Sequence, residues 1–163
     1  MRTLLVLRHA KAAQDDSALT DHARPLTKKG RKTARLMGEL LREEGLMPDL
    51  VLSSTAERAR ATADAVVEAA GHAGEVTYLD ELYLAEPPAY LESLRRLGEG
   101  AECVLVVGHN PGIEALIFRL TGQMEHMPTA ALARCSLPIA HWSELGPETL
   151  GELAKVYRPK ELD

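Results

Sequence analysis

The sequence is poor in aromatic residues and in cysteine. Only 4% of its 163 residues are aromatic, so we expect a core made mainly of aliphatic side chains. The only two cysteines, Cys103 and Cys135, lie far apart, and the sequence has no CxxC motif or Cys/His cluster of the metal-binding type. We therefore expect no metal site and no other cofactor. Cys103 lies in an apolar run, which predicts a buried thiol in a protein from a reducing compartment.

The sequence also lacks a long apolar segment and an excess of positive charge. The apolar run near the N-terminus is too short for a signal peptide or a membrane span. A net charge of -5 does not favour a nucleic-acid partner. We therefore expect a soluble, cytoplasmic protein that binds neither a membrane nor nucleic acid. The length and the 45% of hydrophobic residues suit one domain that spans 1–163.

Short apolar segments typical of buried strands alternate with segments that have the spacing of helices. This alternation predicts an α/β fold, a three-layer sandwich with a mostly parallel central sheet and helices on both faces. Thr27 is the expected N-cap of the first helix, and the hydroxyls of 53–55 are the expected caps of the second. The expected strands are 4–7, 50–52, 76–78, 103–107, 132–137 and 153–157. The expected helices are 28–44, about 56–70, 87–97 and one that follows the turn 108–112 and ends at about 120.

Cations and histidines follow three of the expected strands. Arg8 and His9 follow the first strand, Arg58 lies in the first turn of the helix after the second, and His109 follows the fourth. Because the carboxyl ends of parallel strands meet at one edge of a sheet, these side chains would share a cleft. Guanidinium groups suit phosphate oxygens, and a bound anion would explain a cation at a helix N-terminus. The alternative is that all of them are solvated turn residues.

Four motifs stand in this order along the chain: Arg8-His9, Arg24-Pro25-Leu26-Thr27 with Gly30, the group Ser54, Arg58, Ala59 and Thr62, and His109. Their order and spacing resemble the histidine phosphatase superfamily, also called phosphoglycerate mutase-like, and most of all its small SixA-type phosphohistidine phosphatases. The resemblance covers nearly the whole chain. In place of the Gly that commonly follows Arg-His in the superfamily, this sequence has Ala10 and then Lys11, which we expect to be solvated.

The resemblance implies a phosphatase with a phosphoglycerate mutase-like fold and a phosphohistidine intermediate. His9 would attack phosphorus, and water would then hydrolyse the phosphorylated histidine. Cationic side chains and a second histidine would hold the phosphoryl oxygens, so no metal would be needed. The expected phosphate-binding residues are Arg8, Arg24, Arg58, His109 and Asn110.

The acid that protonates the leaving group is a separate question. Glu81 stands in a Leu-x-Glu context that resembles the acid of many superfamily members. Asp80 and Glu86 are nearby alternatives, and the competing interpretation is that all three are ordinary loop carboxylates. A phosphohistidine substrate leaves as an imidazole that can already be protonated, so it needs an acid less than a phosphoester does.

The short chain has no long segment after Tyr83, which indicates an open cleft. An open cleft favours a phosphorylated protein, in particular one that carries phosphohistidine, or a loosely held small phosphorylated substrate. The alternatives are a sugar-phosphate phosphatase or mutase of the same superfamily and a non-catalytic phosphate-binding module. The sequence leaves the oligomeric state open. We expect the remaining histidines and the tryptophan at the surface, namely His22, His72, His126, His141 and Trp142.

Overall fold

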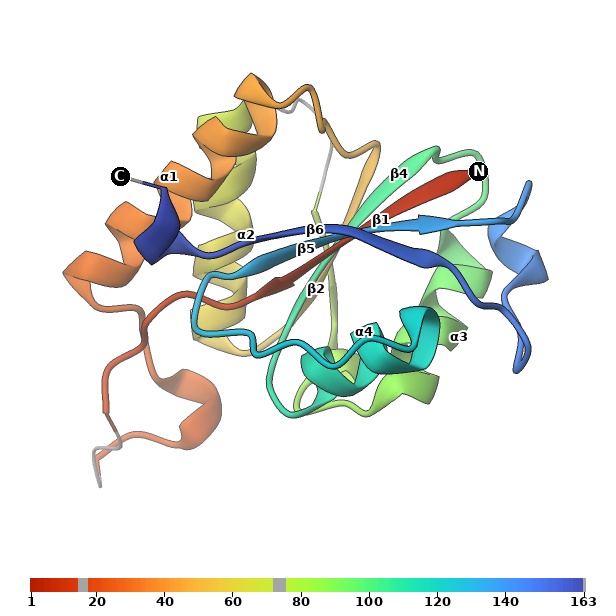
Figure 1. The fold of residues 1–163 in the computed structure, drawn as a ribbon. Coiled ribbons are helices and arrows are strands. Elements are labelled where there is room, and N and C mark those ends of the chain that lie inside the picture. The colour runs from red at the N-terminus through yellow and green to blue at the C-terminus, as the bar shows by residue number, and fades with distance from the viewer. Residues whose placement is uncertain (15–17, 72–75, 163) are drawn as a thin grey trace.

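The computed structural model describes residues 1–14, 18–71 and 76–162 of the chain. In these residues six strands form one sheet, in the order β3-β2-β4-β1-β5-β6 (Figure 1). Neighbouring strands from β3 to β1 are parallel, and β5 runs antiparallel to both β1 and β6. The strands are β1 (Arg2–Arg8), β2 (Leu50–Ser54), β3 (Val76–Leu79), β4 (Cys103–Gly108), β5 (Leu132–Leu137) and β6 (Glu152–Tyr157).

Helices cover both faces of the sheet. The helices α1 (Lys28–Glu43) and α2 (Glu57–Ala70) lie on one face, and α3 (Pro87–Leu97) and α4 (Gly112–Thr121) lie on the other (Figure 1). Side chains of β1 alternate between the two cores: Leu5 packs with the first pair of helices and Leu4 with the second. The predicted three-layer α/β sandwich with a mostly parallel sheet is confirmed.

The two helices nearest the site begin in different ways. Thr27 caps α1 as predicted, because its hydroxyl oxygen accepts a hydrogen bond from the Gly30 N–H at 2.9 Å. The prediction of a hydroxyl cap on α2 was wrong, since its N-cap is Ala56, which makes no side-chain hydrogen bond. The Ser54 hydroxyl accepts from the Ala56 N–H at 3.2 Å, one residue before the helix begins.

Two further expectations need correction. Trp142 is buried rather than exposed: it begins the 3₁₀ helix η3 (Trp142–Glu144), packs against α3, and donates from Nε1 to the Ala101 carbonyl. Its polar neighbours in the sequence conceal this packing. Cys103 is partly exposed at the start of its strand, and the fully buried cysteine is Cys135.

The other surface residues agree with expectation only in part. His126 and His141 lie at the surface, His22 is half-buried, and His72 lies outside the described residues. Among the helices that the structure describes, none is long and apolar enough to span a membrane. The cytoplasmic location stays a prediction.

Candidate active site

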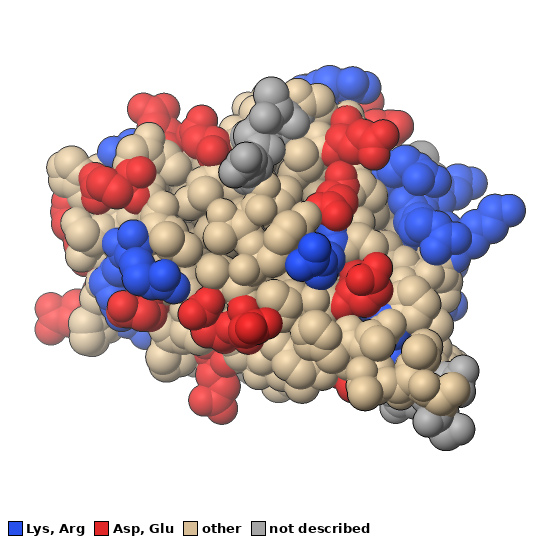
Figure 2. Space-filling view, turned by 180° about the vertical axis from the view of Figure 1, so that it is seen from behind, with Lys and Arg blue, Asp and Glu red and all other residues tan. Residues whose placement is uncertain are grey.

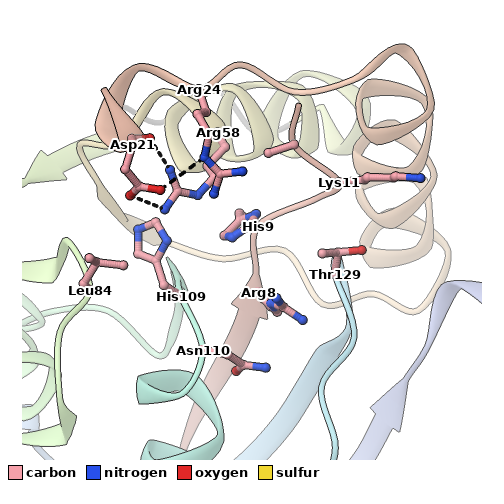
Figure 3. A pocket seen from close by; sticks show the side chains of 11 residues that line it. Arg8, His9, Lys11, Asp21, Arg24, Arg58, Leu84, His109, Asn110 and Thr129 are labelled. Atoms are coloured by element: carbon pink, nitrogen blue, oxygen red, sulfur yellow. Dashed lines mark hydrogen bonds and ion pairs between the residues drawn. The ribbon is translucent and has the colours of Figure 1, made fainter. Parts of the chain in front are cut away.

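Three neighbouring strands of the sheet end at the same level and open into one pocket. Arg8 of β1 lies beside Gly108 of β4, and Ser53 of β2 lies beside Val107 of β4. The residues at these strand ends therefore meet, as the sequence predicted. The pocket is lined by Arg8, His9, Lys11, Ala12, Asp21, Arg24, Arg58, Leu84, His109, Asn110 and Thr129 (Figure 3).

The lining divides into two parts, which we name here. Arg8, His9, Arg58 and His109 form the floor of the pocket, and the latter three are buried. The rim consists of the exposed residues Asp21 and Leu84 together with the half-buried Arg24. Asp21 belongs to the 3₁₀ helix η1 (Asp21–Ala23), and Leu84 follows the 3₁₀ helix η2 (Asp80–Leu82).

His9 is held with one ring nitrogen directed at the pocket. Its Nδ1 lies 2.7 Å from the Ala10 carbonyl oxygen, which can only accept, so Nδ1 carries the ring proton and Nε2 keeps a free lone pair. Burial, with added repulsion from Arg58 and Arg8, lowers the pKa of His9 to about 4. His9 is therefore a neutral imidazole at pH 7, the form that a nucleophile requires.

The segment that follows His9 is fixed by the motif residues found in the sequence. The Ala10 N–H donates to Thr62 Oγ1 at 2.9 Å, and the Thr62 hydroxyl donates to the Arg58 carbonyl at 2.7 Å. Gly30 lies so close to Lys11 that a Cβ on it would stand 2.1 Å from the Lys11 carbonyl oxygen. Thr62 therefore supports the backbone that orients His9. Position 30 requires glycine because a side chain would clash with the Lys11 backbone.

The two arginines of the floor keep part of their donor capacity unused. Arg8 donates from one terminal nitrogen to the Met127 carbonyl at 3.1 Å. Arg58 donates to the Asp21 carbonyl at 2.7 Å and to Asp21 Oδ2 at 3.0 Å. Within the described ranges, the Nε atoms of both arginines are buried without a hydrogen-bond partner. Both guanidinium groups line the pocket, and their remaining N–H groups suit the oxygens of a bound oxyanion.

His109 completes the floor from the end of β4. Its Nε2 shares a hydrogen bond of 2.8 Å with Ser54 Oγ, and its ring centroid lies 5.2 Å from that of His9. Its Nδ1 is buried and finds no partner in the part of the chain that the structure describes. Burial, followed by the neighbouring His9 and Arg58, lowers the pKa of His109 to about 3. His109 is thus a second neutral imidazole beside the first.

Asn110 and Arg24 line the pocket, but their side chains already have protein partners. The Asn110 amide donates to Glu114 Oε2 and to the Met127 carbonyl, both at 3.0 Å. Arg24 donates to Asp21 Oδ1 at 3.1 Å and to the Ala13 carbonyl at 2.7 Å. Both residues hold neighbouring segments in place, and direct contact with phosphate stays a prediction for each.

The predicted acid lies away from the pocket. Glu81 is not among the lining residues, and its half-exposed carboxylate pairs with Arg96 at 3.6 Å. Of the two alternatives, Asp80 accepts a hydrogen bond from the Thr55 hydroxyl at 2.7 Å, and Glu86 stands at the N-cap of α3. The acid role of Glu81 stays a prediction, and the geometry of the pocket does not favour it.

Sequence reasoning missed Asp21 of the rim and the contacts of the neighbouring His22. Asp21 was not singled out, although a carboxylate three residues before the motif arginine Arg24 was a usable signal. His22 was expected at the surface, yet its ring stands edge-on to Tyr83 at 4.8 Å, and its Nε2 donates to Thr55 Oγ1 at 3.0 Å. Lys11, which we expected to be solvated, is exposed at the edge of the pocket.

Charge is distributed unevenly over the surface. Figure 2 shows the largest group of Lys and Arg side chains at one edge of the face seen from behind, while smaller basic groups and the acidic groups are scattered over the rest. The first half of α1 carries a run of exposed cations and no acidic residue in its first turn, and this end of the helix contacts Lys11 at the pocket. The exposed cations of this run are Lys28, Lys29, Arg31, Lys32 and Arg35.

Comparisons with known proteins agree with this geometry. The family model of the histidine phosphatase superfamily (branch 1) matches residues 4–83. The phosphohistidine phosphatase SixA of Escherichia coli is 32% identical over 140 residues, which cover 82% of this chain and 84% of that protein. The chain belongs to the histidine phosphatase superfamily. The match includes the floor residues that come from β1 and α2.

Solved structures of SixA-type members have the same fold. The SixA structure from Nakamurella multipartitia is 32% identical, with a TM-score of 0.86 over 97% of this chain and 96% of that chain. A protein histidine phosphatase SixA solved in complex with tungstate is 27% identical, with a TM-score of 0.84 over 99% of both chains. The present protein is therefore a SixA-type phosphatase of this superfamily with the phosphoglycerate mutase-like fold that the motifs implied.

Proposed function

We propose that this SixA-type phosphatase removes the phosphoryl group from phosphohistidine in proteins, with His9 as the nucleophile. The observation that carries the proposal is the neutral, buried His9, whose Nε2 lone pair faces a pocket lined by Arg8, Arg58 and His109, each of which has one buried nitrogen without a partner in the described residues. A module that only bound phosphate would need the arginines but not a nucleophile prepared in this way.

In the first step, His9 Nε2 attacks phosphorus in line with the P–N bond of the substrate. The new N–P bond forms as the substrate P–N bond breaks, and its electron pair returns to the leaving imidazole. His9 keeps its Nδ1 proton, and the resulting positive charge on the phosphorylated ring is stabilised by the Ala10 carbonyl. Arg8, Arg58 and His109 hold the three equatorial oxygens, where negative charge gathers in the transition state.

In the second step, water attacks the phosphorylated His9 from the side that the leaving imidazole has vacated. A P–O bond forms, the P–N bond to His9 breaks, and the water protons leave on the product phosphate. His9 returns to the neutral imidazole with its proton still on Nδ1. The guanidinium groups supply the charge stabilisation in this step as well.

Two features favour phosphohistidine over phosphoserine. A serine alkoxide is a poor leaving group that needs an acid, and the one candidate acid drawn from the motifs, Glu81, is paired with Arg96 outside the pocket. A protonated imidazole leaves without such help. The exposed cations of α1 beside Lys11 also favour a large acidic partner, such as a phosphorylated protein, whose surface can reach them, over a small phosphorylated molecule held in the pocket alone.

A comparison of substrates tests the proposal. We expect kcat/KM to be higher for a phosphohistidine peptide than for a phosphoserine peptide of the same sequence, and we expect Glu81→Gln to affect the first substrate less than the second. Faster cleavage of phosphoserine or of a small sugar phosphate would refute the phosphohistidine assignment and favour the small-molecule alternative. Such a result would leave the role of His9 as a separate question.

A further inference from the structure

Asp21 is an acidic residue in a pocket otherwise suited to an anion. Among the lining residues that the structure describes, it alone carries a carboxylate, whereas four carry cationic groups. Figure 3 shows its side chain above His109 and directed at Arg58. A carboxylate beside a phosphate site repels a phosphate dianion, so its presence requires an explanation beyond binding phosphate.

The Asp21 carboxylate is held in place from three sides. Oδ2 accepts hydrogen bonds from Arg58 and from the Tyr83 hydroxyl, and Oδ1 accepts from Arg24 at 3.1 Å. The hydrogen bond from Tyr83, together with Arg58 and Arg24, lowers the pKa of Asp21 to about 2. The group is therefore ionised at neutral pH, and it acts as an acceptor and not as a proton donor.

The neighbouring segments fix the turn that carries Asp21. His22 Nε2 donates to the Thr55 hydroxyl oxygen, and this hydroxyl donates to Asp80. These bonds join η1 to the end of β2 and to η2. The carboxylate thus stands at a fixed place on the rim before any substrate binds, and a fixed charge discriminates between ligands more sharply than a mobile one.

The residues around Asp21 form one wall of the pocket. Leu84, His109 and Asp21 lie together on one side of His9 in Figure 3. The Tyr83 ring, which holds Asp21, stands edge-on to His109 with centroids 5.6 Å apart. Leu84 is exposed and adopts a φ of 51°, a conformation that is unfavourable for leucine and is often found at functional sites. This wall offers apolar surface, ring edges and one acceptor, which together fit a flat cationic ring.

We propose that Asp21 selects substrates whose leaving group is a protonated imidazole, by accepting a hydrogen bond from the ring N–H that lies opposite the phosphorylated nitrogen. This inference rests on the proposed function and deepens it. In the complex, the cationic ring lies between the carboxylate and the phosphoryl group and offsets their repulsion. A phosphoserine or an aryl phosphate brings no cation, so the repulsion remains.

The same contact assists the bond-breaking step. When the P–N bond breaks, its electron pair neutralises the imidazolium ring. The ring N–H that donates a hydrogen bond to Asp21 keeps its proton and leaves with the imidazole. No proton needs to move from the protein. By keeping the ring protonated until that moment, Asp21 takes over the task that an acid performs for phosphoesters.

The test compares Asp21→Asn with wild type on a phosphohistidine peptide and on p-nitrophenyl phosphate. We expect kcat/KM for the peptide to fall about tenfold to hundredfold, the usual range for losing a charge-assisted hydrogen bond. The value for the aryl phosphate should stay the same or rise. Glu57→Gln, which removes one exposed carboxylate from the first turn of α2, is the matched control and should change neither value.

Further measurements separate the competing explanations. A loss of the same size on both substrates would mean that Asp21 only orients Arg58, and a gain on both would mean that it only blocks the pocket; either result overturns the inference. Asp21→Glu, which restores the charge, should recover part of the preference for the peptide. A wild-type enzyme that fails on the peptide but cleaves the aryl phosphate would instead refute the proposed function.

The pH dependence of the wild-type enzyme gives a test that needs no variant. As the pH falls from about 8 to about 6, more of the substrate imidazole is protonated, and the ratio of kcat/KM for the peptide to that for the aryl phosphate should rise. A ratio that is flat or falls over this range contradicts the inference even if every Asp21 variant fails to fold.

Discussion

The floor of the pocket is held mainly by the backbone of buried strands, whereas its rim is held by side chains on short exposed turns. His9 and His109 follow two paired strands, and their positions follow from the register of the sheet. Asp21 and Tyr83 lie 62 residues apart in the sequence and meet through a side-chain hydrogen bond. From this comparison we infer that the fold sets the phosphate-binding floor, while the rim sets which leaving group is accepted.

The largest effect is expected at the floor, from His9→Ala. Without a nucleophile, kcat on the phosphohistidine peptide should fall by about a thousandfold or more, while the fold and tungstate binding remain. Steady-state kinetics and calorimetry measure the two properties. If His9→Ala hydrolyses the phosphohistidine peptide at close to the wild-type rate, His9 is not the nucleophile.

The second-largest effect is expected from Arg58→Ala, which should weaken anion binding. Tungstate affinity is expected to drop about tenfold to hundredfold, because a buried guanidinium with an unsatisfied Nε is lost. Arg60→Ala is the matched control, since Arg60 stacks over Tyr78 on the same helix and does not line the pocket. Equal tungstate affinity in Arg58→Ala and wild type would remove Arg58 from the phosphate site.

The lowered histidine pKa values of the floor predict a loss of stability in acid. The unfolded chain takes up a proton on His9 near pH 6.5, but the folded protein does so only near its pKa of about 4, so the unfolded state binds more protons between these values. The free energy of unfolding should therefore fall as the pH drops. From about pH 7 to about pH 5, wild type should lose about 2 kcal/mol more than His9→Asn.

Urea unfolding at the two pH values measures this difference. Tungstate should reduce the loss in wild type, because a bound anion favours the protonated histidines. If wild type and His9→Asn lose stability equally, the His9 pKa is not lowered as described.

Thr62→Val should have a smaller effect that acts through the backbone. The variant leaves the buried Ala10 N–H without its acceptor, which should cost about 1–3 kcal/mol of stability. Because Ala10 orients His9, kcat should fall about tenfold while tungstate affinity is kept. Thr33→Val, where the hydroxyl bonds only within α1, is the control. Unchanged kcat in Thr62→Val would show that this support does not position His9.

The smallest effect is expected from Glu81→Gln, at a residue outside the pocket. Because Glu81 pairs with Arg96 away from the pocket, kcat/KM on the phosphohistidine peptide should stay within about threefold of wild type. A loss of a hundredfold or more would restore Glu81 as the general acid and would mean that its side chain turns into the pocket when substrate binds.

Most of the fold and most of the floor could be predicted from the sequence, for one physical reason. Buried strands are continuous apolar runs, so β1 and β4 stand out, and the residues that directly follow them must lie at one edge of the sheet. Sequence order alone therefore brings Arg8, His9 and His109 together. The cap Thr27 was also predicted, since an N-cap favours particular residue types, whereas the close contact of Gly30 with Lys11 was found only in the structure.

The rim and some packing could not be predicted, because they depend on contacts between distant side chains. A Leu-x-Glu context does not tell which way Glu81 faces on a 3₁₀ turn, and the sequence does not show that Tyr83 reaches Asp21. Trp142 lies among polar neighbours and is buried only because η3 packs on α3. The single-domain expectation for 1–163 stays a prediction.

Trapping the phosphorylated enzyme tests the central claim most directly. A rapid acid-free quench of wild type during turnover of the phosphohistidine peptide, followed by peptide mass spectrometry, should find one phosphoryl group, stable to base and labile to acid, on His9. His9→Ala should yield none. A phosphoryl group on another residue, or turnover without any phosphorylated enzyme under conditions where hydrolysis of the intermediate is slowed, would contradict the account.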